Sequence, residues 1–166
     1  QPPGSGPEVQ DDVVIDAISY SVAGDVQLAG RGLGGEFVRV YVNNRPIQTV
    51  RIAEDGGWST DLPDVESGVY TLRIDQLDAE GRVTSRFETP FQREDPAVLA
   101  VAFAAQAPER GVRAQIITVQ PGYTLWGIAK RTYGDGILYV RVFEANRRQI
   151  RNPDLIYPGQ VFSLPE

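Results

Sequence analysis

The chain of 166 residues contains no histidine and no cysteine. Without these residues it cannot form a Ser-His-Asp triad, a Cys-His pair, a thiolate or imidazole zinc site, a CxxC redox pair or a disulfide. Most hydrolase chemistry is therefore excluded. A mechanism that uses only carboxylates, or a metal site with only oxygen ligands, stays open.

Long apolar runs and basic runs are absent as well. No segment approaches the ~18 consecutive apolar residues of a membrane-spanning helix, so no membrane span is expected within the chain. The net charge is −6. Because phosphate binding needs clustered lysine and arginine, nucleic acid is not an expected partner. The chain begins at Gln1 without a signal-peptide pattern, which predicts a fragment or processed product whose export signal or anchor lies upstream.

The charge is unevenly distributed along the chain. Residues 1–114 carry 10 basic and 18 acidic side chains, whereas residues 115–166 carry 6 basic and 4 acidic side chains. The length suits one medium domain or two small ones, and this contrast favours two. The sequence predicts a linker tail at 1–12, a first domain at 13–93, a connector at 94–114 and a second domain at 115–166.

Short runs of β-branched and aromatic residues fill residues 13–93 and alternate with turns rich in glycine, asparagine and aspartate. Six or seven strands with a turn about every 8–12 residues predict an antiparallel β-sandwich. Trp58 is expected to anchor its core. The segment 54–85, with its DGGW turn, Leu-Pro, GVYT strand and DAEG hairpin, resembles the second half of bacterial Ig-like repeats. This resemblance implies an all-β Ig-like sandwich that serves as a spacer or interaction module.

Three acidic residues of this segment, Asp75, Asp78 and Glu80, allow two interpretations. They could ligate calcium, but an all-oxygen site needs about 6–8 ligands on a defined loop. A solvated strand end and turn is therefore the favoured interpretation.

The connector contains the apolar stretch 96–107. It predicts either a short helix that begins at Pro96 or an extended edge segment, because so short a run fits both. In either case its apolar character predicts that it packs against a domain.

The sequence of the second domain predicts a β-α-α-β unit. Residues 115–119 predict a strand, and Thr124 is placed to cap a helix that ends at Tyr133-Gly134. A second helix is expected from Leu138 to about Gln149. The segment 161–165 predicts a closing strand that pairs antiparallel with the first and leaves both helices on one face.

These residues resemble a LysM domain, a small α+β module that binds peptidoglycan and chitin. The match covers about 50 residues at fixed spacings. It is carried by Val119, Gly122, Thr124, Leu125, Trp126, Ile128, Ala129, Tyr133, Gly134, Ala145, Asn146, Ile150, Pro153, Asp154, Ile156, Tyr157, Pro158, Gly159, Gln160 and Pro165. One departure is Tyr123, which stands where the family has aspartate.

The resemblance implies a glycan groove between the loop after the first strand and the loop before the last one. Glycine and proline in these loops leave backbone N–H and C=O groups free to meet the N-acetyl amides and hydroxyls of GlcNAc. Each sugar should bind weakly. The predicted glycan contacts are Gly122, Tyr123, Thr124, Leu125, Asn152, Pro153, Asp154, Leu155 and Ile156.

Structural roles are expected for the other prominent side chains. Trp126 is expected to pack in the core or against the partner helix, with stacking on sugar as the alternative. Tyr133 and Phe143 are predicted core residues, and Asn146 is predicted to bond the backbone of the neighbouring loop. The basic cluster of Arg147, Arg148 and Arg151 fits either a solvated helix face or an attraction to anionic wall polymers.

The leading hypothesis is a non-catalytic protein of the periplasm or cell envelope that holds peptidoglycan without a metal or cofactor. An alternative arises because residues 133–160, with the longer pattern YGDGxxYxxxFEANRxxIxxPDxIYPGQ, also resemble the LysM domains of phage-tail and injection-system adaptors and of a small potassium-binding protein. There the domain would serve protein contacts or ion sensing. A third possibility is the targeting arm of an enzyme whose catalytic part lies upstream.

Overall fold

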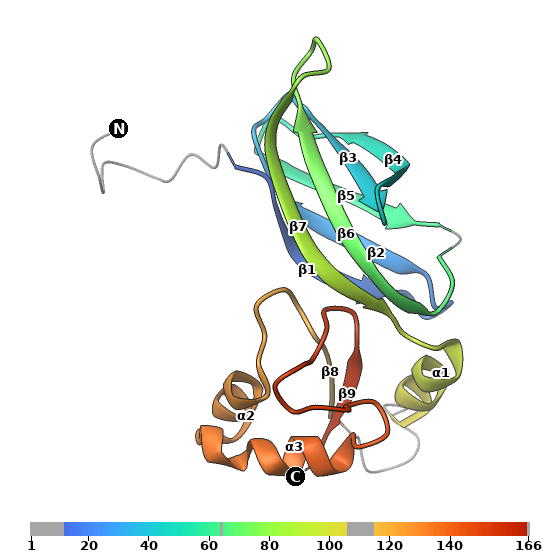
Figure 1. Cartoon of the computed structure of the whole chain (residues 1–166), viewed down its shortest axis with the longest axis vertical. Coiled ribbons are helices and arrows are strands. Elements are labelled where there is room, and N and C mark those ends of the chain that lie inside the picture. Colours follow the sequence, from blue (N-terminus) through green and yellow to red (C-terminus); the bar gives the residue numbers. More distant parts are fainter. Residues whose placement is uncertain (1–11, 64, 106–114, 166) are drawn as a thin grey trace, which may run out of the picture.

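The computed structural model describes residues 12–63, 65–105 and 115–165 (Figure 1). Nearly all of the predicted linker tail, and the connector from residue 106 onward, lie outside the described residues. Strands predominate over helices in the part that is described. None of the described helices has the length and apolar character that crossing a membrane requires.

Residues 13–93 form two antiparallel sheets, as the alternating pattern predicts. One sheet has three strands in the order β1-β2-β5, and the other has four in the order β4-β3-β6-β7. The strands are β1 (Val14–Tyr20), β2 (Val26–Arg31), β3 (Phe37–Val42), β4 (Arg45–Arg51), β5 (Gly57–Leu62), β6 (Gly68–Leu77) and β7 (Val83–Arg93). We refer to residues 13–93 as the sandwich.

The two sheets of the sandwich enclose one hydrophobic core. Ile18 and Leu28 of the three-stranded sheet belong to the same buried cluster as Val40 and Ile74 of the four-stranded sheet. Trp58 is buried in this cluster, and its indole Nε1 donates a hydrogen bond to the backbone oxygen of Arg31 at 3.2 Å. The expectation that Trp58 anchors the core is confirmed.

The acidic residues near the β6–β7 hairpin take part in internal contacts. Asp75 is only 1% exposed and pairs with Arg86 at 2.8 Å and Arg73 at 3.3 Å. The expectation of a solvated Asp75 was wrong, because Arg86 of the neighbouring strand β7 and Arg73 of the same strand cover it. Asp78 accepts hydrogen bonds from the backbone N–H groups of Glu80 and Arg82, and these bonds hold its pKa below the ordinary value.

The C-terminal region folds in the predicted β-α-α-β order. Its elements are β8 (Gln115–Thr118), α2 (Leu125–Tyr133), the 3₁₀ helix η2 (Gly136–Leu138), α3 (Tyr139–Ala145) and β9 (Val161–Leu164). Strands β8 and β9 pair antiparallel. The hydroxyl of Thr124 caps α2 by accepting from the N–H of Gly127 at 3.0 Å, and Gly134 ends the helix in the left-handed conformation.

Helix α3 is shorter than the sequence predicts, since it ends at Ala145 rather than near Gln149. Asn146 leaves helical geometry, and its buried side chain bonds both the N–H and the C=O of Ser163 in β9. Asn146 does bond backbone groups, as predicted. The predicted partner, the neighbouring loop, was wrong, because the bonded backbone belongs to strand β9. Tyr133 and Phe143 pack against the buried core of this region, as expected.

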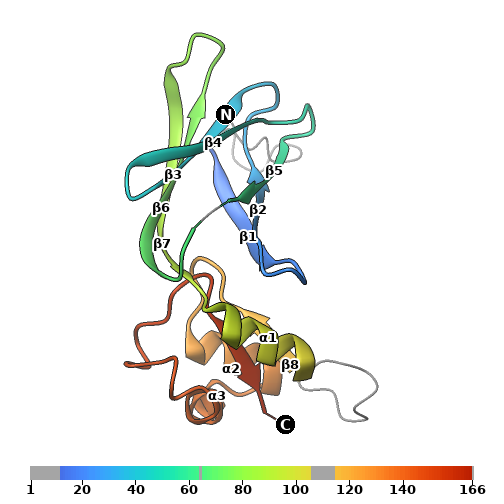
Figure 2. The same ribbon diagram turned by 90° about the vertical axis from the view of Figure 1, so that its right-hand side faces the viewer.

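The connector begins as a helix, α1 (Pro96–Ala105), which resolves the choice between helix and extended segment. Its N-terminus is capped by Asp95, whose carboxylate accepts from the N–H of Ala97 at 2.7 Å. Leu99 and Ala102 pack on Val161 of β9. As Figure 2 shows, α1 lies against the β8–β9 sheet, on the face opposite the core that this sheet shares with α2 and α3.

Candidate functional site

The first loop of the candidate site runs from the end of β8 to the start of α2. Gly122 turns the backbone with a φ of +88°, and Tyr123 donates its N–H to the backbone oxygen of Gln120. The Thr124 hydroxyl caps α2 by accepting the hydrogen bond from the N–H of Gly127. The loop is therefore a tight turn whose shape is set by local hydrogen bonds.

The second loop lies between α3 and β9 and is closed by its own backbone. The Asn152 carboxamide oxygen accepts from the N–H of Asp154 at 2.9 Å, and the Asn152 backbone oxygen accepts from the N–H of Leu155 at 2.8 Å. Further on, the buried side chain of Gln160 accepts from the N–H of Tyr157 at 2.7 Å. These bonds give the loop a defined shape without a ligand.

A hollow of about 330 Å³ opens between the two loops. We call it the loop hollow. It is lined by Tyr123, Thr124, Leu125, Trp126, Tyr139, Pro153, Asp154 and Ile156. Of the predicted glycan contacts, Gly122, Asn152 and Leu155 are not in its lining, although the side chain of Leu155 is 54% exposed beside it.

Two aromatic side chains of the loop hollow were not among the predicted contacts. Trp126 is 55% exposed, so of the two expected positions, in the core or against the partner helix, the core position was wrong. Its ring lies directly over Gly136, where any side chain would collide with it. Tyr139 enters the hollow from the start of α3. Trp126 is not on the face of α2 that carries the buried residues Leu125, Ile128 and Ala129. This position in the helical repeat could have identified it as a surface residue.

The departure from the family pattern at Tyr123 has a structural partner. Arg131 of α2 donates a hydrogen bond to the Tyr123 hydroxyl at 2.8 Å, and its guanidinium lies 4.8 Å from the centre of the tyrosine ring. The first loop therefore presents an aromatic surface held by a cation, where the family usually has a carboxylate. Asp154 of the second loop is the only charged residue in the lining.

The lining offers binding groups rather than a pair of carboxylates. Among the described residues it contains one carboxylate, that of Asp154, and so lacks the pair of acids that most glycosidases use. Across the described ranges, no group of three or more potential metal-ligating side chains occurs. Aromatic and aliphatic surface next to backbone polar groups suits a ligand with one apolar face and several hydrogen-bonding groups.

Both loops are attached at their bases to the sandwich. The Gln120 side chain accepts from the N–H of Ile18 at 2.6 Å and donates to the Ile18 oxygen at 2.8 Å. The Tyr20 hydroxyl donates to the Gly159 oxygen at 2.7 Å. All lining residues belong to the C-terminal region, so neither the described part of the connector nor the sandwich fills the loop hollow.

Glu94 joins the sandwich, α1 and β9 at one buried point. Its carboxylate, in a residue only 2% exposed, accepts from the N–H of Val161 at 2.8 Å and of Asp95 at 3.2 Å. Its own N–H donates to the Tyr20 hydroxyl at 2.9 Å. Burial raises the pKa of Glu94 above its ordinary value and raises the pKa of Tyr20 to about 12. This contact could not be predicted from the sequence, because no local pattern around residue 94 indicates a partner as distant as Val161.

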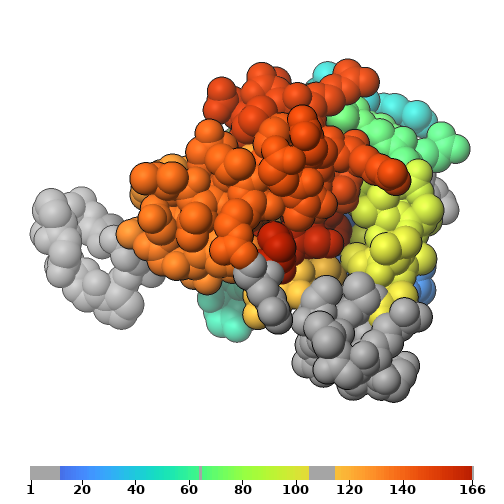
Figure 3. All heavy atoms as spheres, turned by 90° about the horizontal axis from the view of Figure 1, so that it is seen from below, coloured from blue at the N-terminus to red at the C-terminus, as the bar shows by residue number. Residues whose placement is uncertain are grey.

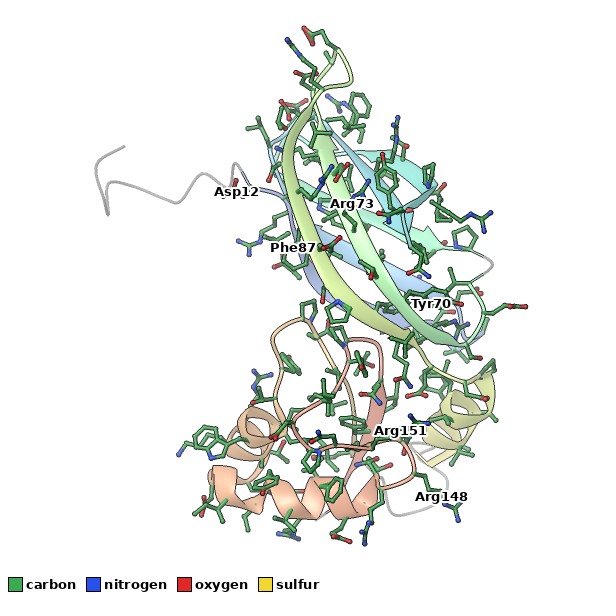
Figure 4. The ribbon with its side chains drawn as sticks, in the orientation of Figure 1. Asp12, Tyr70, Arg73, Phe87, Arg148 and Arg151 are labelled. Atoms are coloured by element: carbon green, nitrogen blue, oxygen red, sulfur yellow. The ribbon has the colours of Figure 1, made fainter. Side chains whose placement is uncertain are left out.

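The predicted basic cluster is split between two environments. Arg147 pairs with Glu144 at 3.2 Å and lies over the ring of Phe143. Arg148 and Arg151 form no ion pair with a described residue, and in Figure 4 they lie on the side of the C-terminal region that faces α1. The cluster is therefore not part of the loop hollow.

Residues 117–165 match the family model described as LysM domain. In the same region, 52 residues are 50% identical to the Potassium binding protein Kbp of Escherichia coli O6:H1, an alignment that covers 31% of this chain and 35% of that protein. A second match, 44% identical over 50 residues, is to an uncharacterized protein of Deinococcus radiodurans and covers 30% of this chain and 19% of the relative. The predicted resemblance of the C-terminal region to LysM is confirmed, and residues 117–165 are a LysM domain.

Proposed function

We propose that the protein is a non-catalytic binding protein that holds peptidoglycan, or another glycan containing GlcNAc, in the loop hollow of its LysM domain. The observation that carries this proposal is the open hollow between two preformed loops within the matched residues. In it, Trp126 and Tyr139 offer flat faces to a sugar ring, and the loops offer backbone polar groups.

The wider organisation of the chain is part of the same proposal. Residues 13–93 would be an Ig-like domain that spaces or presents the LysM domain, residues 94–114 a connector, and residues 115–166 the glycan-binding unit. A protein that holds peptidoglycan works in the periplasm or cell envelope. The two-sheet core supports the assignment of the first domain, and the packing of α1 supports a stiff connector.

The test is sedimentation of the protein with purified peptidoglycan. We expect the wild-type chain to sediment, and Trp126→Ala to weaken binding about tenfold, as truncation of a central aromatic contact typically does. Leu155→Asp should also weaken it, while Val22→Asp, the same kind of change at a 90% exposed site on the sandwich, should not. A folded wild-type protein that stays in the supernatant would contradict the proposal, and so would release of muropeptides.

Potassium binding is the second candidate, favoured by the 50% identity to a protein named for it. Potassium is held by backbone carbonyl oxygens, so it needs no acidic cluster. Thermal unfolding in equal concentrations of potassium and sodium chloride distinguishes the candidates. A melting temperature that rises with potassium alone would favour this second function, and identical curves would count against it.

A further inference from the structure

Helix α1 has an apolar surface around its whole circumference, because Pro96–Ala105 contains no polar or charged side chain. A helix of this kind is normally buried on all sides. Here Leu99 and Ala102 are buried against the β8–β9 sheet, but Val101 is 71% exposed. The outward face of α1 is therefore apolar surface without a described partner.

A groove of about 440 Å³ lies between this helix and the end of α3. Val98, Val101 and Ala102 form its α1 wall, Ala145 and Arg148 stand opposite, and β9 forms the floor. We call it the α1–α3 groove. Seen from below in Figure 3, the red end of the chain lies between the orange α3 and the yellow α1. The α1–α3 groove shares no lining residue with the loop hollow.

The floor of the groove cannot accept an added β-strand. The N–H of Val161 is bonded by Glu94 and its oxygen by the side chain of Gln149. Asn146 bonds both the N–H and the oxygen of Ser163. Since the backbone edge of β9 is already paired, an occupant must fill the groove with side chains, as an amphipathic helix does.

The charge at the rim indicates what kind of helix fits. Arg148 is the only charged residue among the described residues of the lining, and in the view of Figure 4 Arg151 lies on the same side of the C-terminal region. Neither forms an ion pair with a described residue, whereas the adjacent Arg147 does. Carboxylates that flank the apolar side chains of an incoming helix would complement these guanidinium groups.

We propose that the α1–α3 groove is the docking site for an amphipathic helix of a partner protein, whose apolar side chains fill the groove and whose acidic side chains pair with Arg148 and Arg151. A second copy that docked through its own α1 is a poorer occupant, because Pro96–Ala105 contains no acidic side chain to pair with Arg148 and Arg151. The proposal is independent of glycan binding, since the two sites are separate.

The test uses the full chain and two fluorescent helical peptides of about 16 residues. Both carry leucines along one face, flanked by glutamates in one peptide and by lysines in the other. We expect the glutamate peptide to bind with micromolar affinity, at least tenfold more tightly than the lysine peptide. Equal affinity for the two peptides, or no binding of either, would overturn the proposal.

Variants assign the binding to the groove. Val101→Asp should abolish binding, and Arg148→Glu should weaken binding of the glutamate peptide and strengthen binding of the lysine peptide. Val22→Asp is the matched control and should change neither. Binding of the glutamate peptide that survives Val101→Asp would overturn the assignment. Because Val101 is exposed, its variant should stay folded, which circular dichroism checks.

Two further measurements examine the rival occupants. A dimer in analytical ultracentrifugation that Val101→Asp dissociates would mean that a second copy covers the face, and would overturn the proposal. Sedimentation with vesicles of phosphatidylglycerol and phosphatidylcholine that depends on Val101 would favour a membrane and would also overturn it. Peptidoglycan sedimentation should be the same for Val101→Asp and wild type, which keeps this proposal distinct from glycan binding.

Discussion

At the scale of single residues, the space around the backbone and its φ angle determine where only glycine fits without cost. Gly159 lies under the ring of Phe91 and against the backbone oxygen of Gln92, so a Cβ there would collide with both. It also has a φ of +98°. Gly134 has a similar φ of +83° but open space around it. Substitution of Gly134 would therefore cost backbone strain alone, whereas substitution of Gly159 would cost strain and a steric collision.

We expect Gly134→Ala to cost about 1 kcal/mol of unfolding free energy from strain alone. Gly159→Ala should cost more, about 2–4 kcal/mol, because the junction with the sandwich must also shift. Urea unfolding of both variants measures the difference. Equal losses would mean that the Gly159 contact relaxes without cost.

Glu94 predicts a dependence of stability on pH. Its folded pKa is raised by burial, so the folded protein holds the proton more tightly than the unfolded chain. The cost of the buried charge is full above the folded pKa and is relieved as the pH falls through it toward the unfolded value. Arg93, Asp95 and Tyr20 are the groups that face it.

Glu94→Gln removes this titration while keeping a side chain of the same shape. The stability of the wild type relative to Glu94→Gln should therefore rise as the pH is lowered from 7 to 4. Urea unfolding of both proteins across that range provides the measurement. Parallel curves would show that the Glu94 carboxyl group titrates alike in the folded and unfolded protein.

At the scale of elements, side chains rather than backbone bonds join α3 to β9. Asn146 ends the helix and bonds Ser163 twice, and the next turn contributes Gln149 to Val161. Helical periodicity predicts how α3 begins but not where it ends, because the competing partner of Asn146 lies 17 residues further along the chain.

Asn146→Ala should destabilise the protein by about 1–3 kcal/mol, since it leaves the N–H and C=O of Ser163 without their partner. Asn152→Ala is a suitable comparison, because Asn152 is exposed and bonds only its own loop. Its loss should be below about 1 kcal/mol. Thermal unfolding of the two variants tests the ranking, and a larger loss for Asn152→Ala would contradict it.

At the scale of the whole molecule, the sandwich and the LysM domain meet through hydrogen bonds, one between the backbones of Gln92 and Pro158 and the others between backbone and side chain. The Gln120 side chain bonds both the N–H and the C=O of Ile18. The Tyr20 hydroxyl donates to the Gly159 oxygen and accepts from the N–H of Glu94. Figure 1 shows the sandwich above the LysM domain, with α1 beside β9. Unfolding of either part would break these hydrogen bonds and leave their polar groups without partners. The two parts are therefore expected to unfold together.

Calorimetry should therefore show one cooperative transition for the wild-type chain. The double variant Tyr20→Phe with Gln120→Ala should separate it into two, because it removes bonds at both loop bases. A control is Tyr70→Phe, which removes a hydroxyl bonded only within the sandwich, to the Glu66 oxygen. Two transitions in the wild type would show that the junction does not couple the two parts.

The sequence by itself determined the antiparallel strands, the β-α-α-β order and the LysM resemblance, because these depend on periodicity, caps and turn residues that are local in the chain. It also placed most of the lining of the loop hollow, as loop positions are tied to motif spacing. Only the tertiary structure decided that Trp126 faces solvent, that Asp75 is buried among arginines, and that Glu94 joins three elements. Those outcomes depend on partners distant in sequence, which periodicity does not encode.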